Sequence, residues 1–115
     1  MSPSIHVHVI PSRRLEGRAA SALTRALTLA ELFVGEPIDL VIDLSHVGFI
    51  DSLGASALAT ILRRVPKGSR VVLASPQPSI SAIVRMTRLH DVFAIYPDVE
   101  SAIRALESVK QVING

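Results

Sequence analysis

An aspartate and a serine stand together where an apolar run gives way to a helical pattern. Residues 40–44 are apolar except for Asp43, and Asp51 and Ser52 follow after a short loop. Open α/β sheets place their chemistry at the carboxyl ends of strands. The first backbone N–H groups of a helix have no partner within the helix, so such a junction can hold an anion. Asp51 and Ser52 are therefore the candidate functional residues.

A second interpretation of the same pair is purely structural. Serine and aspartate are common helix N-caps, and a cap contributes about 1 kcal/mol to the helix. On the residues alone, capping by Asp51 or Ser52 is the simpler explanation.

Two elements are expected before this junction. Residues 5–9 alternate Ile5, Val7 and Val9 with two histidines, which predicts a strand with one face exposed. We interpret its histidines as a solvated strand edge rather than a metal pair, because no third and fourth ligands are in view. Apolar residues then recur at steps of three and four over residues 15–33, which predicts an amphipathic helix that Gly35 and Pro37 end. The pattern is compatible with a very short additional strand within residues 13–16 but does not require it.

The later segments continue the alternation of strands and helices. Residues 38–44 predict a central strand covered on both faces, and residues 52–65 a helix with a buried stripe at Leu58, Ile61, Leu62 and Val65. Strands are expected at residues 70–74 and 92–96. Ser79 is the expected N-cap of a helix through Ile80 and Val84, and Asp98 that of the last helix. Alternation of this kind requires crossover connections, hence an α/β fold with a mainly parallel mixed sheet of four or five strands and about four helices.

Length, charge and composition exclude several classes of function. At 115 residues and 49% hydrophobic, residues 1–115 fit one domain with a core. The net charge is only +2, and the basic residues come without the stacking aromatics or motif of a nucleic-acid binder, so no nucleic-acid partner is expected. The chain has no cysteine, no signal-peptide pattern and no apolar run that spans a bilayer. We expect a cytoplasmic protein without membrane insertion, with no metal and no cofactor.

Enzymatic alternatives lack their motifs. Ser52 with His46 or His90 and Asp43 or Asp51 supplies the residue types of a catalytic triad, but the Gly-x-Ser-x-Gly elbow is missing. A phosphoaspartate receiver needs an acidic pair after the first strand, where this chain has Ile10-Pro11-Ser12. No Gly-x4-Gly-Lys phosphate loop occurs. The chain is not expected to be an enzyme.

The motif and its surroundings resemble a known family. The run Val41-Ile42-Asp43-Leu44-Ser45 followed by Phe49-Ile50-Asp51-Ser52-Leu53-Gly54 is similar to the signature of STAS domains, the fold of bacterial anti-sigma factor antagonists. Later pieces match in order and spacing, namely residues 70–74, residues 89–96, and Glu100, Ala102 and Leu106. The resemblance covers residues 5–107 and implies a small STAS-like sandwich.

The resemblance also implies a function. STAS antagonists bind an anti-sigma factor that is also a serine kinase, the kinase phosphorylates the serine of the motif and so breaks the complex, and a serine phosphatase restores it. By motif position, Ser52 would accept the phosphate, Asp51 would be the neighbouring acid, and Gly54 would allow close backbone approach. The expected partner surface comprises Val47, Phe49, Ser52 and Ser56, on a monomer or weak dimer. Ile50 is expected to staple the helix start to the core.

Three positions differ from the family pattern. Leu53 replaces a small residue, Ala55-Ser56 replaces a Leu-Gly continuation, and Arg13-Arg14-Leu15-Glu16 replaces Gly-x-Leu-Asp. The alternative function is therefore a constitutive STAS interaction module, of a stressosome-like or lipid-transport complex, with no phosphorylation switch.

Overall fold

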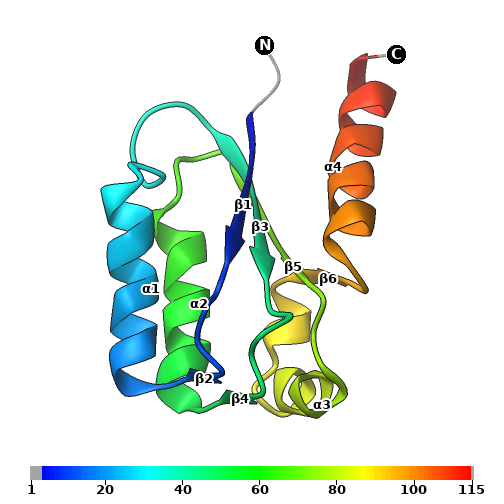
Figure 1. Ribbon diagram of the computed structural model, residues 1–115. Helices are drawn as coiled ribbons and strands as arrows, with labels where there is room; N and C mark the ends of the chain where they lie inside the picture. Colours follow the sequence, from blue (N-terminus) through cyan, green and yellow to red (C-terminus); the bar gives the residue numbers. More distant parts are fainter. Residues whose placement is uncertain (1–3, 115) are drawn as a thin grey trace.

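The structure is a computed structural model that describes residues 4–114, with side chains described for residues 5–108. In chain order the elements are β1 (Ser4–Val9), β2 (Arg14–Leu15), α1 (Gly17–Leu29), β3 (Ile38–Asp43), β4 (Phe49–Ile50), α2 (Ser52–Arg64), β5 (Arg70–Ala74), α3 (Pro78–Met86), the 3-10 helix η1 (Leu89–Asp91), β6 (Ala94–Tyr96) and α4 (Val99–Asn114). Figure 1 shows their arrangement.

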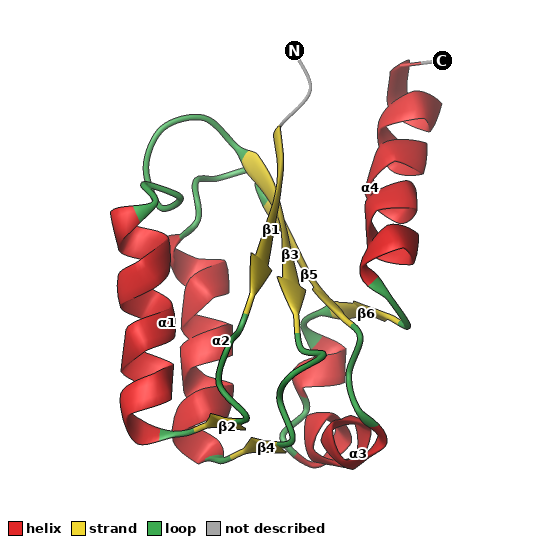
Figure 2. Ribbon diagram, in the orientation of Figure 1, coloured by secondary structure: helices red, strands yellow, loops and turns green. Residues whose placement is uncertain are grey.

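The main sheet has four strands in the order β1-β3-β5-β6, and all of its ladders are parallel. The expected α/β class with a mainly parallel sheet is confirmed, and every described ladder of this sheet is parallel. The short strand expected within residues 13–16 exists as β2, which pairs with β4 in a separate two-stranded sheet. This small sheet lies at one end of the molecule, beside the starts of α1 and α2 (Figure 2).

Helices cover both faces of the main sheet. Helices α1 and α2 lie on one face, and α4 lies on the other (Figure 1). Leu40 and Ile42 of β3 belong to the core cluster on the α1–α2 face, whereas Val41 packs in the cluster that includes Ala102 and Leu106 of α4. Strand β3 is therefore buried on both faces, as its nearly continuous apolar sequence predicts.

Strand β1 is exposed on the opposite face from the one expected. Its register with β3 aligns His6 with Leu40 and His8 with Ile42, so both histidines face α1 and α2 and are partly buried. Val7 and Val9 face the α4 side, where they are 44% and 42% exposed. The reason is tertiary: α4 packs mainly over β3, β5 and β6, and of β1 only Ile5 packs against the cluster that includes α4, so Val7 and Val9 stay exposed.

Two boundaries also differ from the sequence prediction. Helix α3 has Gln77 at its N-cap with Pro78 in its first turn, so Ser79 is not the cap. Proline fits the first helical position because its fixed φ suits the helix and its missing N–H has no helical partner there. Strand β6 is shorter than residues 92–96, because Leu89–Asp91 form a 3-10 helix that places Phe93 in the core. Asp98 does cap α4, accepting a hydrogen bond from the Ser101 N–H at 2.7 Å.

Candidate functional site

The candidate site is the junction of β4 and α2. Asp51 is the N-cap of α2, and its carboxylate Oδ1 accepts a hydrogen bond from the Gly54 N–H at 2.8 Å. Ser52 is the first helical residue and is exposed. Within the described residues, the Ser52 hydroxyl has no hydrogen-bond partner. The cap and the candidate acceptor are thus two different residues, and the serine hydroxyl is not used in holding the helix.

Gly54 has a packing role in the same turn. It is buried, and a β-carbon at this position would overlap the backbone carbonyl oxygen of Leu15 in β2 and come within 3.1 Å of Ile50 Cγ2. The Asp51 N–H also donates to that Leu15 carbonyl, at 3.4 Å. Only glycine allows the first turn of α2 to lie this close to β2. The expected close backbone approach is therefore present, between α2 and the chain's own β2.

The loop before β4 is held by backbone hydrogen bonds. Its Val47 N–H donates to the Leu44 carbonyl at 2.9 Å, and the N–H groups of Gly48 and Phe49 both donate to the Arg13 carbonyl, at 2.7 and 3.2 Å. The Gln77 side-chain amide donates to the Ser45 carbonyl at 2.9 Å. These bonds fix the path of the chain into the junction, so the position of Ser52 is set by the fold.

The loop turns two of its apolar residues inward. Val47 is fully buried in the core, which corrects its placement on the partner surface: the tight turn closed onto Leu44 directs its side chain away from solvent. Ile50 is also buried, beside Gly54, as expected of a residue that staples the helix start. Phe49 is half-buried, and the Arg14 guanidinium carbon lies 4.2 Å from its ring centroid. Of the apolar loop residues, only Phe49 reaches the surface.

Two exposed residues flank Ser52 on α2. Ser56 lies one turn further along the helix and is exposed, in agreement with its predicted surface position. Leu53 is 60% exposed, although it was not among the predicted surface residues. The helical periodicity of the sequence could have predicted this exposure. Leu53 falls outside the buried stripe through Leu58 and Ile61, and a residue outside the stripe faces solvent.

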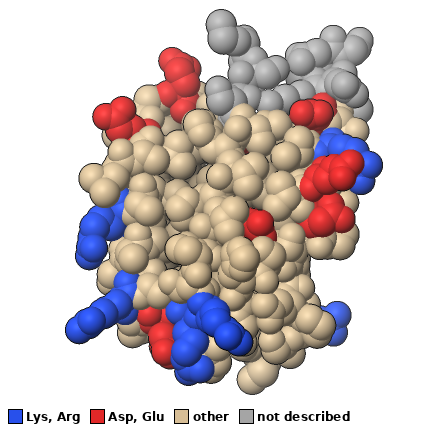
Figure 3. Space-filling model, in the orientation of Figure 1, with Lys and Arg blue, Asp and Glu red and all other residues tan. Residues whose placement is uncertain are grey.

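The surroundings of the junction are basic. An open hollow of about 500 Å³ beside it is lined by Arg14, Glu16, Gly17, Arg18, Asp51 and Leu53, and Arg13 and Arg14 line a second one of about 330 Å³ with Gly48 and Phe49. Figure 3 shows Lys and Arg side chains gathered at this end of the molecule, where β2 and β4 lie. The hydrogen bond from Arg14 Nε to Glu16, 2.8 Å long, raises the pKa of Arg14, with a smaller contribution from the charge of Asp51. Arg14 is therefore a fixed positive charge at the site.

The residue types of a catalytic triad are not brought together. His90 Nδ1 lies 3.4 Å from the Val84 carbonyl and its Nε2 lies 3.3 Å from Asp91, whereas Asp43 accepts from the Ser45 N–H. No histidine in the described part of the chain is hydrogen-bonded to Ser52. Residues 4–114 also hold no cluster of three or more side chains suited to a metal, and none of their helices is long and apolar enough to cross a membrane.

Comparison with known proteins agrees with the fold and the motif. The family model described as STAS domain matches residues 14–102, which include β2, the junction and the start of α4. The chain belongs to the STAS domain family.

Solved structures with the same fold come from several bacteria. An anti-sigma-factor antagonist (STAS) domain protein from Planctomyces limnophilus superimposes with a TM-score of 0.71 and 22% identity over 82% of this chain and 80% of that one. A Thermotoga maritima protein assigned as an anti-sigma factor antagonist gives a TM-score of 0.75 and 21% identity over 88% and 87%. A sulfate transporter family protein from Wolinella succinogenes gives 0.69 and 13% over 93% and 88%. At these identities the likeness concerns the fold.

Proposed function

We propose that this chain is an anti-sigma factor antagonist that binds an anti-sigma factor with serine kinase activity and is released when Ser52 is phosphorylated. The observation that carries the proposal is the division of labour at the start of α2. Asp51 caps the helix, and the hydroxyl of Ser52, one residue later, is exposed and unpaired among the described residues. Membership of the STAS domain family and two structural neighbours described as anti-sigma factor antagonists support the same role.

The proposed partner surface consists of Phe49, Ser52, Leu53 and Ser56. All four are at least partly exposed, and three of them lie on the first two turns of α2. Leu53 is the most exposed apolar side chain of this set, and removing apolar surface from water favours association. Ser52 adjoins Leu53 in the first turn of α2, so a partner that buries Leu53 also comes close to the Ser52 hydroxyl.

The effect of a phosphate follows from the sizes of two opposing terms. A phosphate adds about −1.5 to −2 charges at neutral pH. Within the chain, the helix N-terminus stabilises a negative charge by about 0.3–1 kcal/mol, which opposes the repulsion from Asp51. A docked partner, in contrast, must desolvate a dianion and accommodate its volume. A hundredfold loss of affinity requires only about 2.8 kcal/mol, so the switch acts at the interface.

The test uses the chain from its own cells and the serine-kinase anti-sigma factor of the same organism. Mass spectrometry of the isolated chain is expected to find phosphate on Ser52. In calorimetric titrations with that kinase, Ser52→Ala is expected to bind as tightly as the wild type and Ser52→Asp about a hundredfold more weakly. Ser81→Ala, at an exposed serine of α3 outside the proposed partner surface, is the matched control and should retain both affinity and phosphorylation.

The alternative, a constitutive interaction module, gives the opposite results. An unphosphorylated Ser52, together with equal affinities of the wild type and Ser52→Asp, would show that the serine is not a switch. A serine phosphatase is the remaining partner of the proposal, and it should remove the phosphate and restore binding.

A further inference from the structure

The outer edge of β1 is a strand edge without the usual protection. Proteins blunt exposed edges with charged residues, prolines, bulges or very short strands. Strand β1 has six residues, residues 5–9 include no Lys, Arg, Asp, Glu or Pro, and its register with β3 runs from Ser4 to Val9 without a bulge. The opposite edge, β6, has three residues and is followed by Pro97. Only one of the two edges is built to end the sheet.

The backbone groups on this edge belong to the odd-numbered residues. The Ile10 N–H donates to the Asp43 carbonyl at 3.2 Å, so the amide of Ile10 points toward β3. Because backbone groups alternate in direction along a strand, those of His6 and His8 also point toward β3. The N–H and C=O groups of Ile5, Val7 and Val9 therefore point outward, away from the sheet.

The sequence of β1 is self-complementary about Val7. Read in either direction from Val7, the strand presents a histidine and then a β-branched aliphatic residue: Ile5-His6-Val7-His8-Val9. An antiparallel copy centred on Val7 would place Val7 opposite Val7, Ile5 opposite Val9 and His6 opposite His8. The outward backbone groups of residues 5, 7 and 9 then fall in the hydrogen-bonded pairs of an antiparallel ladder. A dyad centred on His6 would pair only residues 5 and 7 of these three, and one centred on His8 only residues 7 and 9, so the dyad at Val7 uses the most outward backbone groups.

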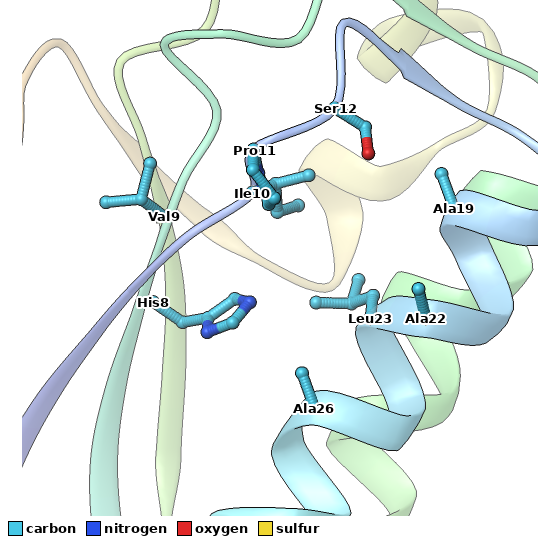
Figure 4. A pocket seen from close by; sticks show the side chains of 9 residues that line it. All are labelled: His8, Val9, Ile10, Pro11, Ser12, Ala19, Ala22, Leu23 and Ala26. Atoms are coloured by element: carbon cyan, nitrogen blue, oxygen red, sulfur yellow. The ribbon is translucent and has the colours of Figure 1, made fainter.

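Both faces of such a ladder are compatible with a second copy. Figure 4 shows the Val9 side chain pointing away from α1 and the His8 ring pointing toward it. On the valine side, Val7 and Val9 are 44% and 42% exposed. Figure 3, which looks onto the β1 edge of the sheet, shows few charged side chains in the middle of the molecule. On the histidine side, a groove of about 240 Å³ separates the end of β1 from α1, and its helical wall consists of Ala19, Ala22, Leu23 and Ala26. No Lys, Arg, Asp or Glu side chain lines this groove.

We propose that the occupant of this edge is a second copy of the chain, bound through antiparallel pairing of the two β1 strands about a two-fold axis at Val7. The pairing joins two four-stranded sheets into one continuous sheet. A symmetric, isologous contact of this kind closes on itself as a dimer. It is independent of the proposed switch, since β4 and the start of α2 lie at the end of the molecule beyond the carboxyl end of β1 (Figure 1).

A cysteine at position 7 tests the dyad directly. Cα atoms of a hydrogen-bonded antiparallel pair are about 5.5 Å apart, but their Cβ atoms are farther apart than the distance of about 3.5–4.5 Å in an unstrained disulfide, so a short cross-linker that reacts with two thiols is used. The chain has no cysteine, so Val7→Cys carries a single thiol. With this cross-linker Val7→Cys is expected to convert largely to a covalent dimer. Val92→Cys is the matched control, because Val92 is similarly exposed but lies next to β6, and it should stay mainly monomeric.

Sedimentation velocity of the cysteine-free chain gives the second measurement. The wild type is expected to show a monomer–dimer equilibrium. Val7→Lys should raise the dissociation constant at least tenfold, because like charges then face each other across the dyad. Val92→Lys should leave the dissociation constant unchanged. Val7→Pro removes an outward N–H without removing a hydrogen bond to β3. This variant should be folded by circular dichroism and monomeric by sedimentation velocity. A wild type that stays monomeric at millimolar concentration, or a Val7→Cys chain that cross-links no faster than Val92→Cys, would overturn the proposal.

Discussion

Each residue of the Asp51-Ser52-Leu53-Gly54 segment has a different task. Asp51 accepts the hydrogen bond that closes the first turn, Gly54 allows the turn to approach β2, and Leu53 and Ser52 face solvent. The structural and the proposed functional interpretations of the Asp-Ser pair are therefore compatible. The aspartate stabilises the helix, and its neighbour is left available for modification.

Gly54 offers a stability test of this arrangement. Alanine has a higher helix propensity than glycine by about 1 kcal/mol, so Gly54→Ala would stabilise an unobstructed helix. Here the added methyl meets the Leu15 backbone carbonyl, which cannot move aside as a flexible side chain would. Overpacking typically costs about 1–3 kcal/mol, and against backbone the cost should exceed the propensity gain. Urea unfolding should therefore show a net loss of up to about 2 kcal/mol.

The matched control is Gly48→Ala in the preceding loop. A β-carbon there would lie 3.6 Å from the Gln77 side chain and 3.8 Å from the Arg13 carbonyl, which are ordinary contacts. Its free energy of unfolding should differ little from that of wild type. A Gly54→Ala variant that is more stable than wild type would show that α2 and β2 are not closely packed at this point.

At the level of elements, one buried ion pair connects β3, β5 and α4. Arg70 donates to both carboxylate oxygens of the fully buried Asp39 at 2.8 Å, and to the Leu106 carbonyl at 3.2 Å. The hydrogen bond to Asp39 raises the pKa of Arg70, so the guanidinium stays charged. The three elements are thus held in register by a contact that the sequence shows only as an aspartate in an apolar strand.

Removing Arg70 alone should lower the free energy of unfolding more than removing both Arg70 and Asp39. Arg70→Met leaves the Asp39 carboxylate buried without its main cation, and broken buried pairs lose about 3–5 kcal/mol. Because Arg70 is 31% exposed, we expect a loss at the lower end, about 3 kcal/mol, in chemical denaturation. The double variant Asp39→Leu/Arg70→Met, which removes the charge as well, should recover most of that stability. A double variant as unstable as Arg70→Met would contradict this account.

The packing of β1 against α1 predicts a pH dependence. Burial lowers the pKa of His8 below its ordinary value of 6.5, and the helical wall it faces is apolar. The unfolded chain therefore binds a proton at a higher pH than the folded chain does. This contribution to stability is complete above pH 6.5 and is lost as the pH falls from there through the lower folded-state pKa.

The measurement compares wild type with His8→Gln at high dilution, by urea unfolding between pH 7.5 and 5. The free energy of unfolding of wild type should fall more steeply with decreasing pH than that of the variant. Parallel curves for the two proteins would show that the His8 ring is solvated in the folded chain.

At the scale of the whole molecule, the sequence predicted correctly the features that depend on neighbouring residues in the chain. Alternating apolar runs and helical periods predicted the α/β class, and the Asp51-Ser52 segment predicted the start of a helix. The errors have tertiary causes. The exposed face of β1 depends on how far α4 reaches, and the burial of Val47 depends on a turn closed by one backbone hydrogen bond. The Arg70–Asp39 pair joins residues 31 positions apart, which no local pattern specifies.

The last prediction concerns how far a charge at Ser52 is felt through the molecule. Ser52 is at the first position of α2, where the helix N-terminus favours negative charge by about 0.3–1 kcal/mol, while the neighbouring Asp51 opposes it. Ser52→Glu should therefore change the free energy of unfolding by less than about 1 kcal/mol, and its amide chemical shifts should change only near the junction. A control at Ser56→Glu separates the effect of the helix N-terminus from that of added charge alone. If Ser52→Glu shifted resonances across the main sheet, a phosphate would act by changing the conformation of the chain, and loss of partner binding would no longer need to arise at the contact surface itself.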